Sequence, residues 1–164
     1  MKTTTEHAAE IRATLKRAHG WTSRQVSVRA EYFSMGSAIR VQINDPAIPL
    51  PAVRTVAQRA ESIDRCPITH EILSGGNTYV NVTYSREAQT ILGRRHADAV
   101  QRAHEATDPG SAVLTPIEGT PFWLGRPHAG RLSLWNEHGY IRDAYSVNSM
   151  AETIGSMMVA REER

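Results

Sequence analysis

The sequence predicts an α+β fold, with a small, mostly antiparallel sheet and helices packed on one face. Some segments carry apolar residues at helical spacing, and others alternate strictly between polar and apolar residues. These segments follow one another in the order helix, hairpin, helix, strand, helix, hairpin, helix. The length of 164 residues suits a single domain that spans residues 1–164.

The first helix is expected over residues 4–19. Thr4 or Thr5 can cap its amino end. Gly20 then ends it, because glycine tolerates the positive φ found at helix C-termini. The apolar stripe that would bury this helix consists of Ala8, Ile11, Leu15 and Ala18.

A β-hairpin is expected over residues 26–43, where apolar and polar residues alternate on both sides of a turn at Met35 and Gly36. One face of such a hairpin is buried and the other is solvated. Arg29 and Arg40 would lie on the solvated face.

The middle of the chain predicts one more strand between two helices. Three prolines in residues 45–51 indicate a rigid linker, since proline continues neither strand nor helix. A second helix is expected over residues 52–64, a strand over 78–85 and a third helix over 86–106. Gly93, in a stretch poor in core residues, is a candidate break in that third helix.

The last part predicts two short extended pieces at 112–119 and 121–125, a hairpin within 131–145 around the turn NEHG, and a helix over 149–163. The last helix is rich in methionine. Its methionines would form either core or a homodimer face: Met150, Met157 and Met158.

Composition indicates a globular protein with almost balanced charge. The net charge is +2, and the basic residues are 17 Arg and two Lys, a bias typical of GC-rich genomes. Cys66 is the only cysteine, so no disulfide can form within the chain. No apolar run approaches the roughly 20 residues that span a bilayer. The beginning of the chain lacks the apolar stretch of a signal peptide. We therefore expect a cytoplasmic protein without a membrane partner.

Arginine and aromatic residues are the best candidates for a binding surface. Together they suit either single-stranded nucleic acid, where bases stack on rings, or a protein interface. The alternative for the tryptophans is simply core. The candidate binding residues are Arg29, Arg40, Arg94, Arg95, Arg126, Arg131, Trp123 and Trp135.

No residue pattern assigns a catalytic centre, a metal or a cofactor. The seven histidines include no pair at i and i+4 on a helix with a third ligand nearby. Motifs for a nucleophilic serine and for phosphate loops are missing. If the protein were an enzyme, the candidates would be His70, Glu71, His96 and Asp98.

The first half of the chain resembles a domain of phage and conjugative-element polyvalent proteins, the twenty-ninth large polyvalent protein-associated domain of its series. The likeness covers residues 8–87 and is strongest over 11–43, and residues 88–164 form an extension without a counterpart. The matching residues are Ile11, Leu15 and Lys16 in the helix, Ser27, Val28 and Arg29 in the first strand, Gly36 and Ser37 in the turn, and Ile39 and Val41 in the second strand.

The chain departs from that family at two positions, with Val26 where the family often has Phe and Ile43 where it often has Trp. The resemblance implies an α+β fold and a mobile-element origin, and it supplies no catalytic residue. We therefore expect a non-enzymatic accessory protein that acts in the host cytoplasm and binds a host or defence protein. The alternatives are a direct nucleic-acid-binding protein and a small enzyme.

Overall fold

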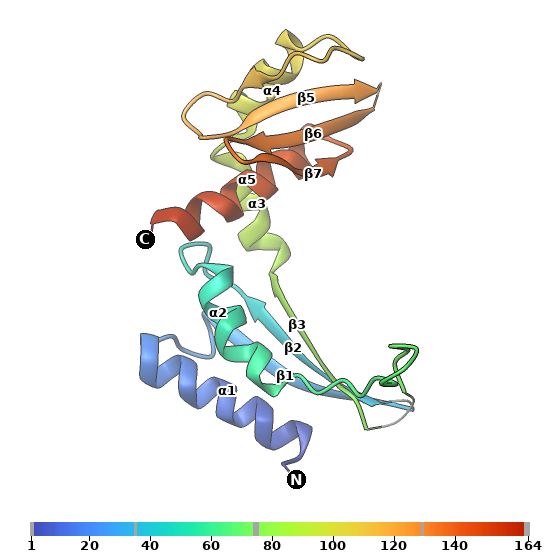
Figure 1. Ribbon diagram of the computed structural model, residues 1–164. Helices are drawn as coiled ribbons and strands as arrows, with labels where there is room; N and C mark the ends of the chain where they lie inside the picture. Colours follow the sequence, from blue (N-terminus) through green and yellow to red (C-terminus); the bar gives the residue numbers. More distant parts are fainter. Residues whose placement is uncertain (1, 35, 74–75, 129, 163–164) are drawn as a thin grey trace. The chain divides into compact units, whose positions relative to one another are not determined.

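The computed structural model describes residues 2–34, 36–73, 76–128 and 130–162 (Figure 1). They form two compact units, Met1–Ala88 and Gln89–Arg164. Helices and antiparallel strand pairs are present in both, so the α+β class is confirmed. The sequence predicts one sheet in one domain, whereas the described residues form two sheets, one in each unit.

The first helix, α1 (Thr4–His19), has the predicted bounds. Its cap lies one residue earlier than predicted, because Thr3 and Glu6 form a capping box. The backbone N–H of Glu6 donates to Thr3 Oγ1 at 3.2 Å, and the backbone N–H of Thr3 donates to the Glu6 carboxylate at 2.6 Å. Gly20 ends the helix in the left-handed conformation, at φ 73°, as predicted.

The first sheet has the order β1-β2-β3. The predicted hairpin is β1 (Val26–Phe33) and β2 (Gly36–Ile43), which pair antiparallel from Val26 opposite Ile43 to Phe33 opposite Gly36. Met35, the other residue of the predicted turn, lies outside the described residues. The third strand, β3 (Thr78–Tyr84), pairs parallel to β2, since the chain crosses over through a helix between them.

That crossover helix corrects the prediction for the proline-rich segment. The helix α2 (Leu50–Ala57) begins inside the expected linker, and the 3₁₀ turn η1 (Gln58–Ala60) ends it before the predicted residue 64. Pro51 occupies its first turn, where backbone N–H groups have no partner within the helix, so the missing proline N–H costs nothing there.

Helices α1 and α2 cover one face of the first sheet (Figure 1). Alternation along the strands places one apolar set beneath them and leaves polar residues on the other face. The buried core of this unit includes Ala8, Ile11, Leu15, Val26, Val28, Ile39, Val41, Ile43, Val53, Ala57, Val82 and Tyr84.

The second sheet is an antiparallel meander with the order β4-β5-β6-β7. The predicted hairpin around NEHG forms β6 and β7, and the expected extended pieces become β4 and β5. The strand bounds are β4 (Thr115–Pro116), β5 (Trp123–His128), β6 (Arg131–Asn136) and β7 (Gly139–Ala144).

Helices α4 (Ala97–Ala106) and α5 (Val147–Glu162) pack on one face of this sheet. The expected helix end at residue 163 lies outside the described residues. Met150 is fully buried in this core, and Met157 and Met158 pack against it. The predicted dimer face on the last helix stays a prediction, and Met150 is not available to it. The core consists of Val100, Ala103, Ile117, Phe122, Leu124, Leu132, Leu134, Ala144, Met150, Ala151 and Ile154.

The expected third helix is two helices, α3 (Arg86–Arg94) and α4, separated at Arg95 and His96. Just before this break, α3 packs closely against α5. A Cβ on Gly155 of α5 would lie 2.5 Å from the backbone oxygen of Leu92, and one on Gly93 would lie 2.8 Å from Glu152 Cγ. Neither helix could approach the other so closely with a larger residue at Gly155.

The Gly155→Ala substitution tests this approach. At a solvent-exposed helix position the change would stabilise the protein by about 1 kcal/mol, because alanine is the better helix former. Here the new methyl group meets backbone, so we expect the free energy of unfolding to fall by about 1–3 kcal/mol. Urea denaturation measures it, with Ser156→Ala on the same helix as control. A stabilised Gly155→Ala protein would contradict the close contact.

Candidate binding surface on the second sheet

Three aromatic side chains share the face of the second sheet that α4 and α5 leave uncovered. Leu124 and Leu134 are paired across β5 and β6 and are fully buried in the core. Their neighbours therefore point to the other face. Trp123 lies opposite Trp135, and Trp135 lies opposite Tyr140 on β7. We call these three residues the aromatic row.

Contacts within the sheet hold Trp135, the central residue of the aromatic row, in place. The rings of Trp135 and Tyr140 meet edge to face, with centroids 5.5 Å apart. The indole Nε1 of Trp135 donates to Ser133 Oγ at 2.9 Å. Gly125 leaves room for this arrangement, because a Cβ there would lie 2.6 Å from Ser133 Oγ and 3.4 Å from the indole nitrogen. The indole is therefore held in one orientation.

The aromatic row is accessible. Tyr140 is 53% exposed, and both tryptophans are half-buried, not part of the core. Leu114, whose side chain would lie 2.9 Å from a Cβ on Gly125, adds a further exposed apolar group beside Trp135. The surface therefore combines large rings with aliphatic contact area.

One ion pair borders the aromatic row. Arg131 Nε donates to Asp143 Oδ2 at 2.9 Å, and its Nη2 forms a second bond to the same oxygen. This hydrogen bonding raises the pKa of Arg131. Desolvation raises the pKa of the Tyr140 hydroxyl most, and the negative charge of Asp143 raises it further. Oδ1 of Asp143 is buried without a hydrogen-bond partner in the described part of the chain.

Arg126 lies on the opposite side of β5 from the aromatic row and has a structural contact. Its Nη1 donates to the backbone oxygens of His104 at 3.1 Å and Thr107 at 2.8 Å. The His104 carbonyl lies in the last turn of α4, where the N–H of Thr107 also donates to it at 3.4 Å, and the Thr107 carbonyl lies just past the end of the helix. The guanidinium therefore caps α4.

The remaining sequence-predicted arginines lie elsewhere. Arg29 and Arg40 face each other across β1 and β2 on the polar face of the first sheet, and Arg40 pairs with Glu31 at 3.0 Å. Arg94 and Arg95 are exposed, at the end of α3 and in the turn before α4. Of the eight predicted binding residues, the structure brings together Trp123, Trp135 and Arg131.

Sequence reasoning missed Tyr140 and Asp143. A hairpin centred on NEHG places Tyr140 opposite Trp135, so the turn alone could have located Tyr140, whereas uninterrupted pairing would place Arg142, and not Asp143, opposite Ser133. An irregularity in the register between Leu134 and Trp135 shifts the pairing, and the sequence gives no signal for it.

The candidate enzyme residues divide between the two units. His70 and Glu71 belong to the first unit, and His96 and Asp98 belong to the second. Across residues 2–34, 36–73, 76–128 and 130–162, no group of three or more His, Cys, Asp or Glu side chains could hold a metal ion.

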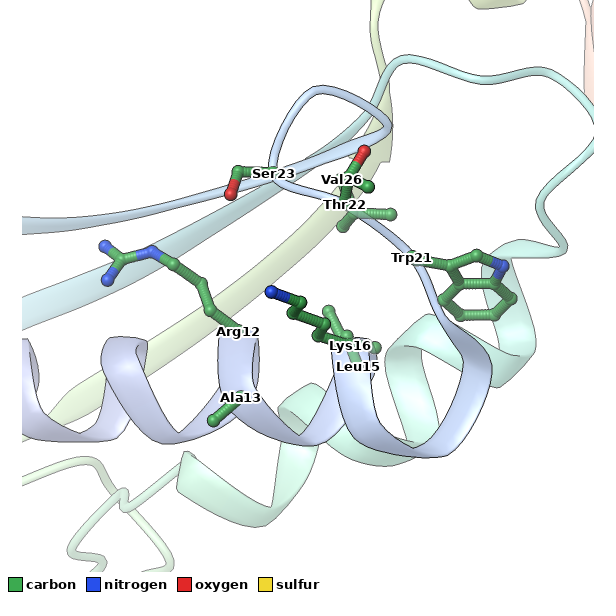
Figure 2. A pocket seen from close by; sticks show the side chains of 8 residues that line it. All are labelled: Arg12, Ala13, Leu15, Lys16, Trp21, Thr22, Ser23 and Val26. Carbon is green, nitrogen blue, oxygen red and sulfur yellow. The ribbon is translucent and has the colours of Figure 1, made fainter.

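A small pocket lies in the first unit between the end of α1 and the turn that leads into β1 (Figure 2). It encloses about 140 Å³, with Arg12, Lys16 and Trp21 in its wall. Arg12 donates from Nε and Nη2 to the backbone oxygen of Val28, at 3.1 and 2.9 Å, and so covers part of the edge of β1. Trp21 stacks on His19 with centroids 4.2 Å apart.

No protein-family model, curated protein or solved structure matches this chain. The resemblance to the polyvalent-protein domain stays a prediction. Among the described residues, no helix has the length and apolar character needed to cross a membrane.

The structural contact of Arg126 predicts a loss of stability when the guanidinium is removed. We expect Arg126→Met to lower the free energy of unfolding by about 1–3 kcal/mol, because the carbonyls of His104 and Thr107 lose a charged donor. Arg95→Met, at an exposed position, should change it by less than about 0.5 kcal/mol. Equal effects of the two substitutions in chemical denaturation would show that Arg126 does not cap α4.

Proposed function

We propose that the protein is a non-enzymatic binding protein that docks a protein partner on the outer face of its second sheet. The aromatic row is the observation that carries this proposal. Trp, Tyr and Arg dominate the energetics of protein interfaces, and rings at the centre of a contact are most effective when aliphatic and polar groups surround them. Leu114 and the Arg131–Asp143 pair provide such surroundings.

Charge favours a protein partner over nucleic acid at this surface. Binding of a single strand combines stacking rings with cations that meet phosphates. Arg131, the cation that borders the aromatic row, is already paired with Asp143. A phosphate close to Asp143 would also be repelled. A protein partner needs no excess of positive charge.

The more specific proposal concerns the origin of the protein and its target. An accessory protein of a phage or mobile element would bind a host or defence protein in the host cytoplasm and block it by covering a surface. The resemblance of residues 8–87 to the polyvalent-protein domain and the arginine-rich composition support this proposal.

Direct binding of nucleic acid is the second candidate, and it rests on the first unit. Lys16, Arg17 and Arg24 are exposed near Trp21, and no ion pair engages them in the part of the chain that the structure describes. Direct binding of nucleic acid predicts that the affinity for nucleic acid falls steeply as the salt concentration rises.

Capture of partners from nuclease-treated host lysate tests the proposed function. We expect the wild-type chain to retain a protein after nuclease treatment, and Tyr140→Ala and Trp123→Ala to lose it. Each ring removed from an interface centre costs about 2 kcal/mol or more, which is roughly a 30-fold loss of affinity. Quantitative mass spectrometry of the captured proteins provides the measurement.

A matched control separates the surface from general damage. Tyr79→Ala removes a half-buried tyrosine from the polar face of the first sheet and should leave capture unchanged. Each variant must first unfold cooperatively in denaturant. A partner lost equally from Tyr79→Ala and Tyr140→Ala, or captured only without nuclease, would contradict docking on the aromatic row.

A further inference from the structure

A groove runs between α1 and α2–η1 in the first unit, on the helical side of the first sheet. It encloses about 400 Å³, which is larger than the pocket near Trp21. Its apolar wall comes from Ile11 on α1 and from Val56 and Ala60 on the other side. Its polar wall consists of Lys2, His7, Glu10, Thr14, Arg17 and Arg59.

Positive charge is in excess along this groove. Among the described residues that line it, Glu10 is the only acid, and the Lys2 ammonium forms an ion pair with it at 2.7 Å. Arg17 and Arg59 remain, one from each side. Neither guanidinium has a hydrogen bond or an ion pair in the described part of the chain. Two unpaired arginines therefore face one concave volume.

The electrostatics of Glu10 agree with this excess. The hydrogen bond from Lys2 lowers the pKa of the Glu10 carboxyl most, and the charges of Lys2, His7 and Arg17 lower it further. The charges of Lys2 and Arg17 thus act together on the Glu10 carboxylate. An added anion would experience the same field without needing to displace Glu10 from Lys2.

We propose that this groove binds a small phosphorylated molecule that carries more than one phosphate group. The guanidinium of arginine matches phosphate oxygens with two parallel hydrogen bonds, and unpaired arginines on two helices can hold two phosphates. Ile11, Val56 and Ala60 provide apolar contact for the rest of the molecule. The site lies in the first unit, so it is independent of docking on the aromatic row.

Two features favour a small ligand over a nucleic-acid backbone. The carboxylate of Glu10 lies within the wall, where a continuous row of phosphates would pass it. The net charge of the chain is only +2, so no strong long-range field attracts a polyanion. A compact anion that contacts Arg17 and Arg59 does not have to pass Glu10, and it does not depend on a long-range field.

Titration calorimetry with inorganic tripolyphosphate tests the proposal. We expect the wild-type protein to bind it, and Arg17→Gln and Arg59→Gln each to weaken binding about tenfold or more, since each removes a charge-assisted pair of hydrogen bonds. Arg54→Gln, an exposed arginine on α2 that does not line the groove, should stay within about twofold of wild type. Denaturation curves for all variants confirm that the fold is retained.

Three results would overturn this assignment. The first is no binding of tripolyphosphate at millimolar concentration. The second is an equal loss of affinity in Arg54→Gln, which would indicate nonspecific attraction to positive charge. The third comes from a parallel titration with a 20-nucleotide single strand, a length chosen at roughly the upper range of single-strand site sizes. If tripolyphosphate does not bind, and the single strand binds in a way that depends on Arg17 and Arg59, then the groove is a nucleic-acid-binding site.

Discussion

The structure depends on one constraint, which is that helices cover each sheet on one face only. Side chains alternate between the two faces of a strand, so a strand that buries Leu124 must turn Trp123 outward. In the first sheet the uncovered face carries charged groups such as Arg29 and Arg40, together with the stacked rings of Phe33 and Tyr79. In the second sheet the same rule exposes the aromatic row. Rings that remain in solvent gain free energy when a partner buries them, and this gain would drive docking at the proposed interface.

The arginines sort into three roles that composition alone does not separate. Arg126 caps a helix, and Arg131 is held by Asp143, so neither is free to meet phosphate. Arg17 and Arg59 have no such partner among the residues that the structure describes, and they line a concave groove. A guanidinium that is already hydrogen-bonded contributes shape and order to a surface, whereas an unpaired one contributes attraction for an anion. The two proposals, a protein on the second sheet and a phosphorylated molecule in the first unit, follow from this distinction.

Local signals in the sequence predicted the elements well, and long-range contacts account for the differences. The bounds of α1, the hairpin of β1 and β2, the strand β3 and the hairpin at NEHG followed from periodicity and turn residues. The helix start at Leu50 was missed because prolines were read as breakers, although the first turn accepts them. The break in the third helix was expected at Gly93 and lies just after it, at Arg95 and His96. The second sheet and the approach of Gly155 to Leu92 depend on residues far apart in the chain. Trp123 and Trp135 were candidates from the sequence, and only strand register joins them to Tyr140.

The three tryptophans of the chain provide the most direct test of the proposed interface. Trp123 and Trp135 belong to the aromatic row, and Trp21 lies in the first unit as an internal reference. The measurement is covalent labelling of indole rings, read by mass spectrometry, in buffer and in nuclease-treated host lysate. Docking on the second sheet predicts that lysate protects Trp123 and Trp135 and leaves the labelling of Trp21 unchanged. Protection of Trp21 alone would contradict docking on the second sheet. So would labelling that is the same in lysate as in buffer for each of the three rings.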